Sequence, residues 1–258
     1  MKSCIGLFLF SVFFCSLQAQ QAGLGAPQVA AVENDPFANY HQRWNPMMEK
    51  LFQLVRDDDG IVRHFVGAEV GTPFESESFE KGQVWYEDEN LGEFYYRYNI
   101  FSQEIELKRT LLPEEKHQAL IRDPKVALVL PGRNKEYRYL PFITTKGSKN
   151  EDYLIRIYKG SSLELFKHQE SKFTEAKPAA NSMVSATPSK FTTFTSYFLQ
   201  FRGEPIREVS QKKNKFLKEI DSRWSTDMKE FMKKENTDLS DEAMLIKAVS
   251  YLDMLAKN

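Results

Sequence analysis

The chain has 258 residues, of which 41% are hydrophobic and 28% are charged, and its formal net charge is −1. With 12 glycines, 11 prolines and 2 cysteines, it is neither a collagen-like chain, nor a small disulfide-rich scaffold, nor a wholly disordered protein. A net charge this close to zero produces no positive electrostatic potential that would attract nucleic acid or an anionic lipid surface. No nucleic-acid partner is therefore expected.

Residues 1–19 have the pattern of a secretory signal peptide. Lys2 is followed by an apolar run over residues 4–17 and by a small residue, Ala19, which suits cleavage before Gln20. The run is too short to span a bilayer as a helix, and no other stretch approaches the required length. We therefore expect an exported protein with no transmembrane segment after the signal is removed.

Both cysteines, Cys4 and Cys15, lie inside this segment, so the mature chain contains none. It also contains no Asn-x-Ser/Thr acceptor for glycosylation. Animal secreted proteins of this size usually carry several disulfides, whereas this chain enters an oxidising compartment without any. The sequence thus favours the periplasm or the cell envelope of a Gram-negative bacterium.

The mature chain divides into a flexible N-terminal segment, residues 20–44, and a single β-rich domain, residues 45–258. Asn45 and Pro46 are typical of a helix start, and apolar residues recur at helical spacing up to Arg56. The run 57–60, Asp-Asp-Asp-Gly, ends that helix. In the register of a calcium-binding EF-hand loop, required ligand positions fall on valines, so this run is not such a loop.

Residues 61–210 follow a β pattern. Two series of residues alternate along one stretch, which indicates a strand. One series is Phe94, Tyr96, Tyr98 and Ile100, and the other is Tyr95, Arg97, Asn99 and Phe101. Further strands are expected at 104–109, 118–122, 125–130, 136–144, 152–158, 162–168 and 191–202, with residues 174–190 forming a loop. Short spacings without intervening helices predict a mainly β (α+β) fold: an antiparallel meander sheet of roughly eight to ten strands, which either stays open or curls.

Residues 211–258 change to helical periodicity. A first stretch contains Phe216 and Ile220, a second runs from Trp224 to Met232, and Ser240 is expected to cap a third. We expect these helices, like the one at 45–56, to pack on the sheet. Two apolar stripes should meet in one core, and they consist of Tyr96, Tyr98 and Ile100 on a strand and Leu245, Val249 and Leu252 on the last helix.

No motif or residue spacing in the sequence indicates a catalytic centre. The four histidines, His41, His64, His117 and His168, have no metal-binding spacing among them, and the mature chain has no thiol. Two Ser-x-x-Lys matches, at 78–81 and 210–213, lack the accompanying motifs of a serine enzyme and are expected to be surface residues. We therefore expect no catalytic residues, no metal, no cofactor and no enzymatic activity. A binding site is left unassigned.

Charges and aromatic side chains are unevenly distributed. Residues 69–93 contain eight acids and one base, whereas residues 211–218 contain four lysines and no acid. Such segments either steer a partner or are solvated faces. The chain also has 20 Phe, 11 Tyr and 3 Trp, and Tyr86, Tyr95, Tyr98 and Phe101 lie on strands with aromatic residues on both faces. Such a sheet needs covering on both sides or offers a binding surface.

Segment 71–82, which opens Gly-Thr-Pro-Phe, and segment 96–106, which contains Arg-Tyr-Asn and Glu-Ile-Glu, resemble a family of exported proteins of the Gram-negative envelope for which no activity is established. Thr72 and Phe74 stand where that family has Ser and Tyr, and a helix like that at 245–255 closes its members. The likeness covers residues 68–256 and implies export and a shared β-rich fold. It transfers no functional residue.

Two kinds of function compete at this stage. The first is a non-enzymatic protein-interaction or assembly-accessory component of the envelope, and it rests on the segregated charges and the aromatic content. The alternative is a carrier that holds an apolar ligand, a lipid or acyl chain, in a curled sheet. A hydrolase built from dispersed carboxylates comes third.

Overall fold

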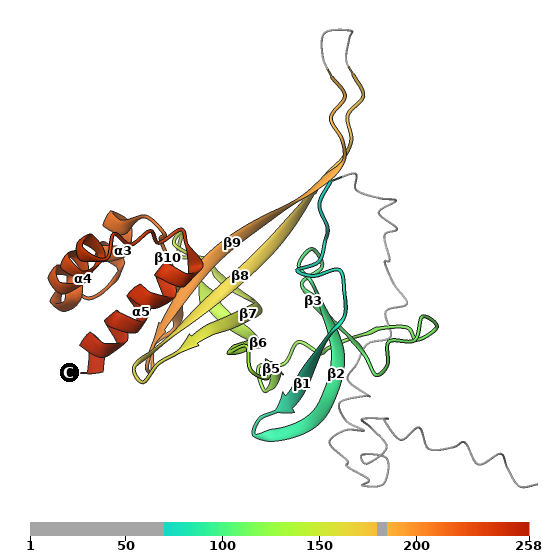
Figure 1. The fold of residues 1–258 in the computed structure, drawn as a ribbon, viewed down its shortest axis with the longest axis horizontal. Coiled ribbons are helices and arrows are strands. Elements are labelled where there is room, and N and C mark those ends of the chain that lie inside the picture. The colour runs from blue at the N-terminus through green and yellow to red at the C-terminus, as the bar shows by residue number, and fades with distance from the viewer. Residues whose placement is uncertain (1–69, 180–184, 258) are drawn as a thin grey trace, which may run out of the picture.

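A computed structural model of the chain describes residues 70–179 and 185–257 (Figure 1). The predicted signal peptide, the flexible segment 20–44 and the predicted helix at 45–56 lie outside these residues, as do His41, His64 and residues 57–60. The predicted N-terminal helix is therefore not among the elements described below.

Within the described residues, ten strands form one sheet and three helices follow them. The strands are β1 (Glu80–Tyr86), β2 (Glu89–Asn99), β3 (Glu104–Lys108), β4 (Gln118–Ala119), β5 (Val126–Leu130), β6 (Lys135–Ile143), β7 (Lys149–Lys159), β8 (Leu163–Thr174), β9 (Lys190–Phe201) and β10 (Ile206–Val209). The helices are α3 (Lys213–Glu219), α4 (Ser222–Lys234) and α5 (Glu242–Lys257). The prediction of a mainly β protein with C-terminal helices is confirmed.

The strand order is β10-β9-β8-β7-β6-β5-β1-β2-β3-β4, and neighbours in this order pair antiparallel. The sheet also closes on itself, because β10 pairs with β6 through Ile206 beside Phe142 and Arg207 beside Ile143. That pair is parallel, and β5 lies beside β1 and not beside β4, so the expectation of an antiparallel meander holds for most of the sheet but not at these two places. Five strands of alternating direction cannot close into a ring without one parallel pair.

This closure gives the ring β6–β10 an inside and an outside. Side chains alternate along each strand, so Leu154 of β7 points into the ring while its neighbours Tyr153 and Ile155 point to the other face. A small cluster fills the ring and consists of Phe142, Leu154, Phe166, Phe198 and Ile206. The opposite face belongs to a larger cluster that runs through the rest of the molecule.

Strands β1–β5 curl over that opposite face. The ring of Tyr98 on β2 lies 6.2 Å from that of Tyr153 on β7, although three strands separate them in the sheet. The Tyr153 hydroxyl donates to the carbonyl oxygens of Leu120 and Ile121, just beyond β4, at 3.1 and 2.9 Å. The predicted face formed by Tyr96, Tyr98 and Ile100 is buried, as expected.

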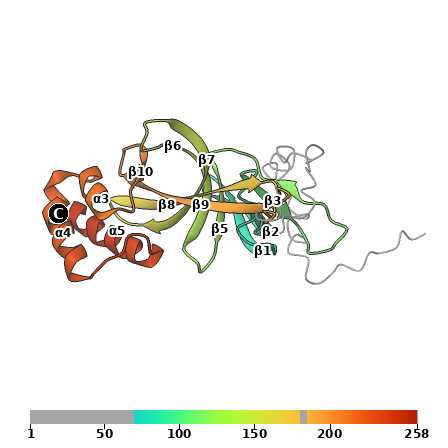
Figure 2. The same ribbon diagram turned by 90° about the horizontal axis from the view of Figure 1, so that it is seen from above.

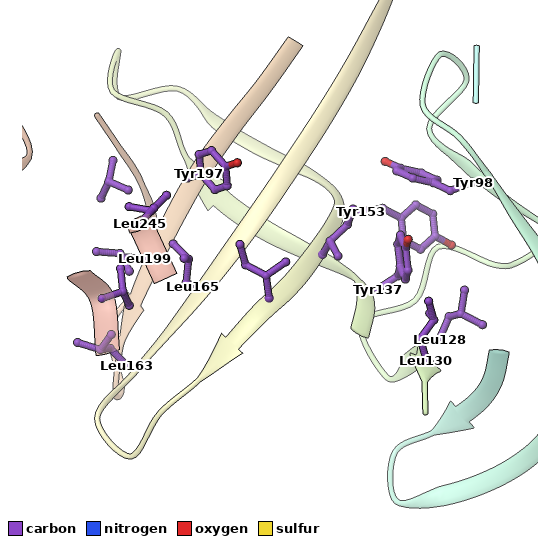
Figure 3. Close-up of a cluster of buried hydrophobic side chains, with 14 of the residues drawn as sticks. Tyr98, Leu128, Leu130, Tyr137, Tyr153, Leu163, Leu165, Tyr197, Leu199 and Leu245 are labelled. Atoms are coloured by element: carbon purple, nitrogen blue, oxygen red, sulfur yellow. The ribbon is translucent and has the colours of Figure 1, made fainter. Parts of the chain in front are cut away.

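The helices cover the other end of the larger cluster. Leu245, Val249 and Leu252 of α5 are fully buried, and they belong to the same cluster as the tyrosines of β2. Figure 3 nevertheless places Leu245 and Tyr98 at opposite ends of it. Figures 1 and 2 show why, since α5 packs on β7 and β8, with α4 on α5 and α3 on α4, while β1–β3 form the far end of an elongated molecule. The apolar stripe of β2 and the apolar stripe of α5 therefore belong to one continuous core, but they pack against different strands.

Two local predictions need correction. The cap of α5 is Asp241, whose carboxylate accepts from the Met244 N–H at 2.9 Å, and Ser240 does not take this role. Asp241 is one residue nearer the first turn, and its carboxylate reaches the free N–H groups there. The predicted loop at 174–190 is also too long, because β8 and β9 pair as far as Thr174 and Lys190 and a further bridge joins Lys177 to Thr187. The two strands thus extend beyond the sheet as an arm.

Candidate functional site

A hollow with a volume of about 520 Å³ opens into the ring β6–β10. Every strand of the ring contributes to its lining, with Phe142 from β6, Arg156 from β7, Phe166 from β8, Gln200 from β9 and Ile206 from β10. Small-molecule sites in proteins commonly measure about 300–1,000 Å³ and sit in the mouths of such barrels. The closure of β10 onto β6 therefore creates a concavity large enough for a ligand.

The floor of the hollow is apolar. Phe142, Phe166 and Ile206 belong to the cluster inside the ring, and Leu140 packs against that cluster while remaining partly exposed. Leu140 and Phe142 lie two residues apart on β6, so the pleat directs both to the same face. The hollow thus presents hydrocarbon and an aromatic edge to whatever enters it.

Charged groups stand along one side of the hollow. The Arg156 guanidinium binds the Glu136 carboxylate and lies 3.3 Å from that of Glu164. Arg138 donates to the Pro124 carbonyl oxygen at 3.1 Å, while its Nε is buried without a hydrogen-bond partner and lies 3.6 Å from Glu136. The Arg138 side chain is 33% exposed, so it remains partly accessible from the hollow although its Nε atom is buried.

The lining has an excess of positive charge. Arg138, Lys149 and Arg156 are the bases, and Glu164 is the acid. Glu136, which pairs with Arg156 and Arg138, lowers this excess to a single positive charge. An apolar floor beside that charge suits a ligand with a hydrocarbon body and an anionic group. The same charges disfavour a cationic ligand.

His168 lies deeper in the ring than the opening. It follows Phe166 on β8 on the side away from Glu164, and its ring packs 5.3 Å from that of Phe142. Its Nε2 lies 3.3 Å from Oδ2 of Asp152 on β7. Ser196 faces His168 across the β8–β9 ladder, but no hydrogen bond from its hydroxyl to the imidazole is present. The nucleophile–base contact of a serine hydrolase is therefore missing here.

The other residues singled out from the sequence lie elsewhere. His117 has its Nε2 3.8 Å from the buried Glu106 carboxylate, which also binds Arg97 at 2.6 Å. Ser78 and Lys81 are exposed, and the hydroxyl of Ser210 accepts from the backbone of its own turn. In residues 70–179 and 185–257, no group of three or more His, Cys, Asp or Glu is placed to hold a metal ion.

Part of the acidic segment is matched by bases, three of which come from outside the segment. Four carboxylates of this segment form ion pairs, in the pairs Glu75–Lys135, Glu80–Arg133, Glu87–Lys125 and Glu93–Lys81. β1 lies beside β5, so the acids of the first hairpin meet the bases around β5 and the start of β6. By contrast, the lysines of residues 211–218 are exposed, and no ion pair to them is found within the described chain.

The aromatic residues of β2 pack inward with other tyrosines. Tyr98 lies 5.6 Å from Tyr137 and Tyr96 lies 5.7 Å from it, ring centre to ring centre. The Tyr137 hydroxyl donates to Glu75. Burial raises the pKa of Tyr96 to about 12, and it raises that of Tyr98 as well. These tyrosines stay neutral and form the core under β1–β3 instead of an open binding surface.

The hollow in the ring was not predicted from the sequence. Its charged residues come from β6, β7 and β8 and stand at ordinary strand positions, so nothing local distinguishes Arg138 or Arg156 from a surface arginine. One available signal was the mixture of large apolar and charged residues at alternate positions of 136–142 and 164–168. Only the pairing of β10 with β6 brings these segments around one space.

Comparison of the chain with protein-family models, with curated proteins and with solved structures returns no match. The resemblance to exported envelope proteins therefore stays a prediction from the sequence. No helix in the described part is long and apolar enough to cross a membrane.

Proposed function

We propose that the protein is a binding protein or carrier for a small amphipathic ligand with an acyl-type hydrocarbon body and an anionic headgroup. The ligand would occupy the hollow of the ring β6–β10. The observation that carries this proposal is the combination, in one concavity of about 520 Å³, of an apolar floor with three bases, which Glu136 and Glu164 neutralise only in part. The proposal contains no chemical step, and it requires neither a cofactor nor a metal.

In this proposal the hydrocarbon lies against Phe142, Phe166 and Ile206, where burial supplies most of the affinity. The headgroup lies beside the partly exposed side chain of Arg138. A carboxylate there gains a charge-assisted hydrogen bond without breaking the Arg156–Glu136 pair. Together with the predicted signal peptide, this suggests a carrier that works in the bacterial envelope.

A protein-interaction role remains the second candidate, because one edge of β9 offers a surface for it. Between Val70, which bridges to Lys190, and β10, which pairs with residues 197–199, one edge of β9 is uncovered by any described strand. Phe194 lies in this stretch and is exposed. Exposed strand edges are common sites for pairing with an extended segment of a partner.

Native mass spectrometry of the protein purified from its own host tests the carrier proposal. We expect a bound species with the mass of a medium-chain acyl anion. Binding of a fluorescent fatty acid should weaken by roughly tenfold in Arg138→Gln, which removes the charge-assisted contact. It should be lost in Leu140→Trp, because the indole fills part of the hollow.

The matched control is Arg223→Gln, which removes an exposed arginine that does not line the hollow and should leave fatty-acid binding unchanged. If the purified protein carries no small molecule and binds the fatty acid equally well in all three variants, the hollow is not the site. A stoichiometric protein partner in place of a lipid would favour the interaction role.

A further inference from the structure

The hollow of the ring β6–β10 has a closed inner end. Phe142, Phe166 and Ile206 line the hollow, and they belong to the buried cluster that also contains Leu154 and Phe198. Leu154 and Phe198 do not line the hollow, and they are 0% and 1% exposed. These two side chains therefore lie behind the floor and fill the space into which the hollow would otherwise continue.

Phe198 supports the floor from behind. It pairs with Phe166 across the β8–β9 ladder, and its ring lies 4.7 Å from that of Phe142, centre to centre. It thus packs against two of the residues that form the floor. Its chain neighbours Tyr197 and Leu199 point to the opposite face and belong to the larger cluster. A change at Phe198 therefore alters the interior of the ring and leaves that larger core in place.

A polar pair lies beside Phe198, away from the hollow. His168 follows Phe166 by two residues on β8, on the side away from Glu164, and its ring lies 6.2 Å from that of Phe198. Its Nε2 is 3.3 Å from Oδ2 of Asp152, and neither residue lines the hollow. Hydrocarbon placed against this pair would leave polar groups without a partner, which costs free energy. The apolar space inside the ring is thus limited in depth.

We propose that Phe198 sets the maximum length of the hydrocarbon that the ring accepts, so that the ligand is an anion with a short or medium acyl chain. This inference rests on the proposed carrier function, because it concerns the ligand of the same hollow. The headgroup lies beside Arg138, and the hydrocarbon runs over Leu140 to the floor. Its terminal methyl group stops there, because Phe198 fills the space behind Phe142 and Phe166.

A limit of this kind has a characteristic dependence on chain length. Affinity should rise roughly fourfold with each methylene that enters the apolar space. It should stop rising once the chain reaches the floor, because further methylenes remain in water. Phe198→Ala removes a buried ring and leaves a cavity next to the floor, since a core relaxes only in part. Longer chains can then bury additional methylenes.

The experiment measures dissociation constants for saturated fatty acids from octanoate to stearate, each below its micelle concentration, by competition with the fluorescent fatty acid. For the unchanged protein, recovered from its host, we expect affinity to reach a plateau within this series. In Phe198→Ala the plateau should move to longer acids. Two additional buried methylenes would strengthen the binding of those acids by roughly tenfold relative to the unchanged protein.

Phe191→Ala is the matched control, because it is the same substitution on the same strand. Phe191 is buried outside the ring, where it packs 5.4 Å from Phe101 and 5.0 Å from Phe173, and it does not line the hollow. Its plateau should coincide with that of the unchanged protein. Phe198→Leu keeps an apolar side chain in the ring and should move the plateau in the same direction by less. It decides the matter if Phe198→Ala does not fold.

The inference is overturned if affinity rises without a plateau as far as stearate, or if the Phe198 variants and Phe191→Ala share one plateau. In either case the carrier proposal stands as long as Arg138→Gln and Leu140→Trp still weaken binding. If no acid of the series binds, or if binding ignores those two variants, the carrier proposal fails and this inference fails with it. The two failures are therefore distinguishable.

Discussion

Asp253 of α5 fixes the last helix to the turn between β7 and β8. Its carboxylate accepts from the N–H groups of Ser161, Ser162 and Leu163 at 3.0, 2.7 and 3.0 Å. Burial acts to raise the pKa of Asp253, but the N–H donors outweigh it and the pKa lies below its ordinary value. A carboxylate bonded in this way stabilises the fold only while it is ionised.

Asp253→Asn should therefore lower the free energy of unfolding by about 1–3 kcal/mol at pH 7, because an amide brings its own N–H groups against backbone donors. The folded pKa lies below the unfolded value of about 3.9, so the advantage of Asp253 is complete above that pH and is lost as the pH falls through the folded pKa. Urea unfolding at pH 7 and at acidic pH measures the difference. A gap between the two proteins that stays constant into strong acid would contradict this role.

Gly160 leaves room for that carboxylate. A Cβ at this position would lie 2.5 Å from Cγ and Oδ2 of Asp253 and 2.6 Å from Oδ1. Gly160→Ala should therefore cost about 1–3 kcal/mol of unfolding free energy, as overpacking does elsewhere. The check is a double-mutant cycle with Asp253→Ala, in which the cost of Gly160→Ala should shrink because the obstructing carboxylate is gone. Equal costs in both backgrounds would assign the effect to the turn alone.

At the scale of the element, α5 docks through a single apolar stripe. Leu252 is 0% exposed, whereas Met254, two residues further along, is 56% exposed. Leu252→Ala should cost about 2–5 kcal/mol of unfolding free energy. Met254→Ala truncates a side chain of similar size on the same helix and should stay within about 0.5 kcal/mol. Similar urea midpoints for the two variants would mean that α5 does not dock through this stripe.

The elements themselves could be read from the sequence, and their assembly could not. Alternation around Tyr96 and Tyr98 gave β2, and helical spacing around Leu245 and Leu252 gave α5, because each pattern is local and each stripe must be buried. The parallel pairing of Ile206 with Phe142 joins residues far apart in the chain and rests on two short stretches of backbone. No local pattern distinguishes Ile206 from an ordinary edge residue.

The candidate site depends on that long-range assembly. The hollow receives one or a few side chains from each of five strands, so no segment carries a motif for it. The distribution of charge also depends on the assembly. Residues 69–93 have an excess of acids in the sequence, but in the fold some of these acids pair with Lys125, Arg133 and Lys135. Distribution along the chain was therefore a poor guide to the surface.

At the scale of the whole molecule, the hollow lies between the two ends of an elongated body. The helices form one end, β1–β3 form the other, and the ring β6–β10 includes the strands between them (Figures 1 and 2). All residues that line the hollow come from β6–β10 or from the turn before β10, so neither end of the body contributes to it.

The last prediction concerns the predicted signal peptide, residues 1–19. The predicted cleavage before Gln20 would remove both Cys4 and Cys15, so the processed protein should contain no thiol and no disulfide. We expect a mass corresponding to residues 20–258, no labelling by a maleimide even after unfolding in urea, and a thermal midpoint that does not change with reductant, since no cross-link contributes to stability. Intact-mass spectrometry of protein recovered from the envelope fraction measures the first two. A retained Met1, a lipid on Cys15 or a labelled thiol would show that residues 1–19 are not removed as a signal peptide. The predicted location in the periplasm or cell envelope would then be wrong as well.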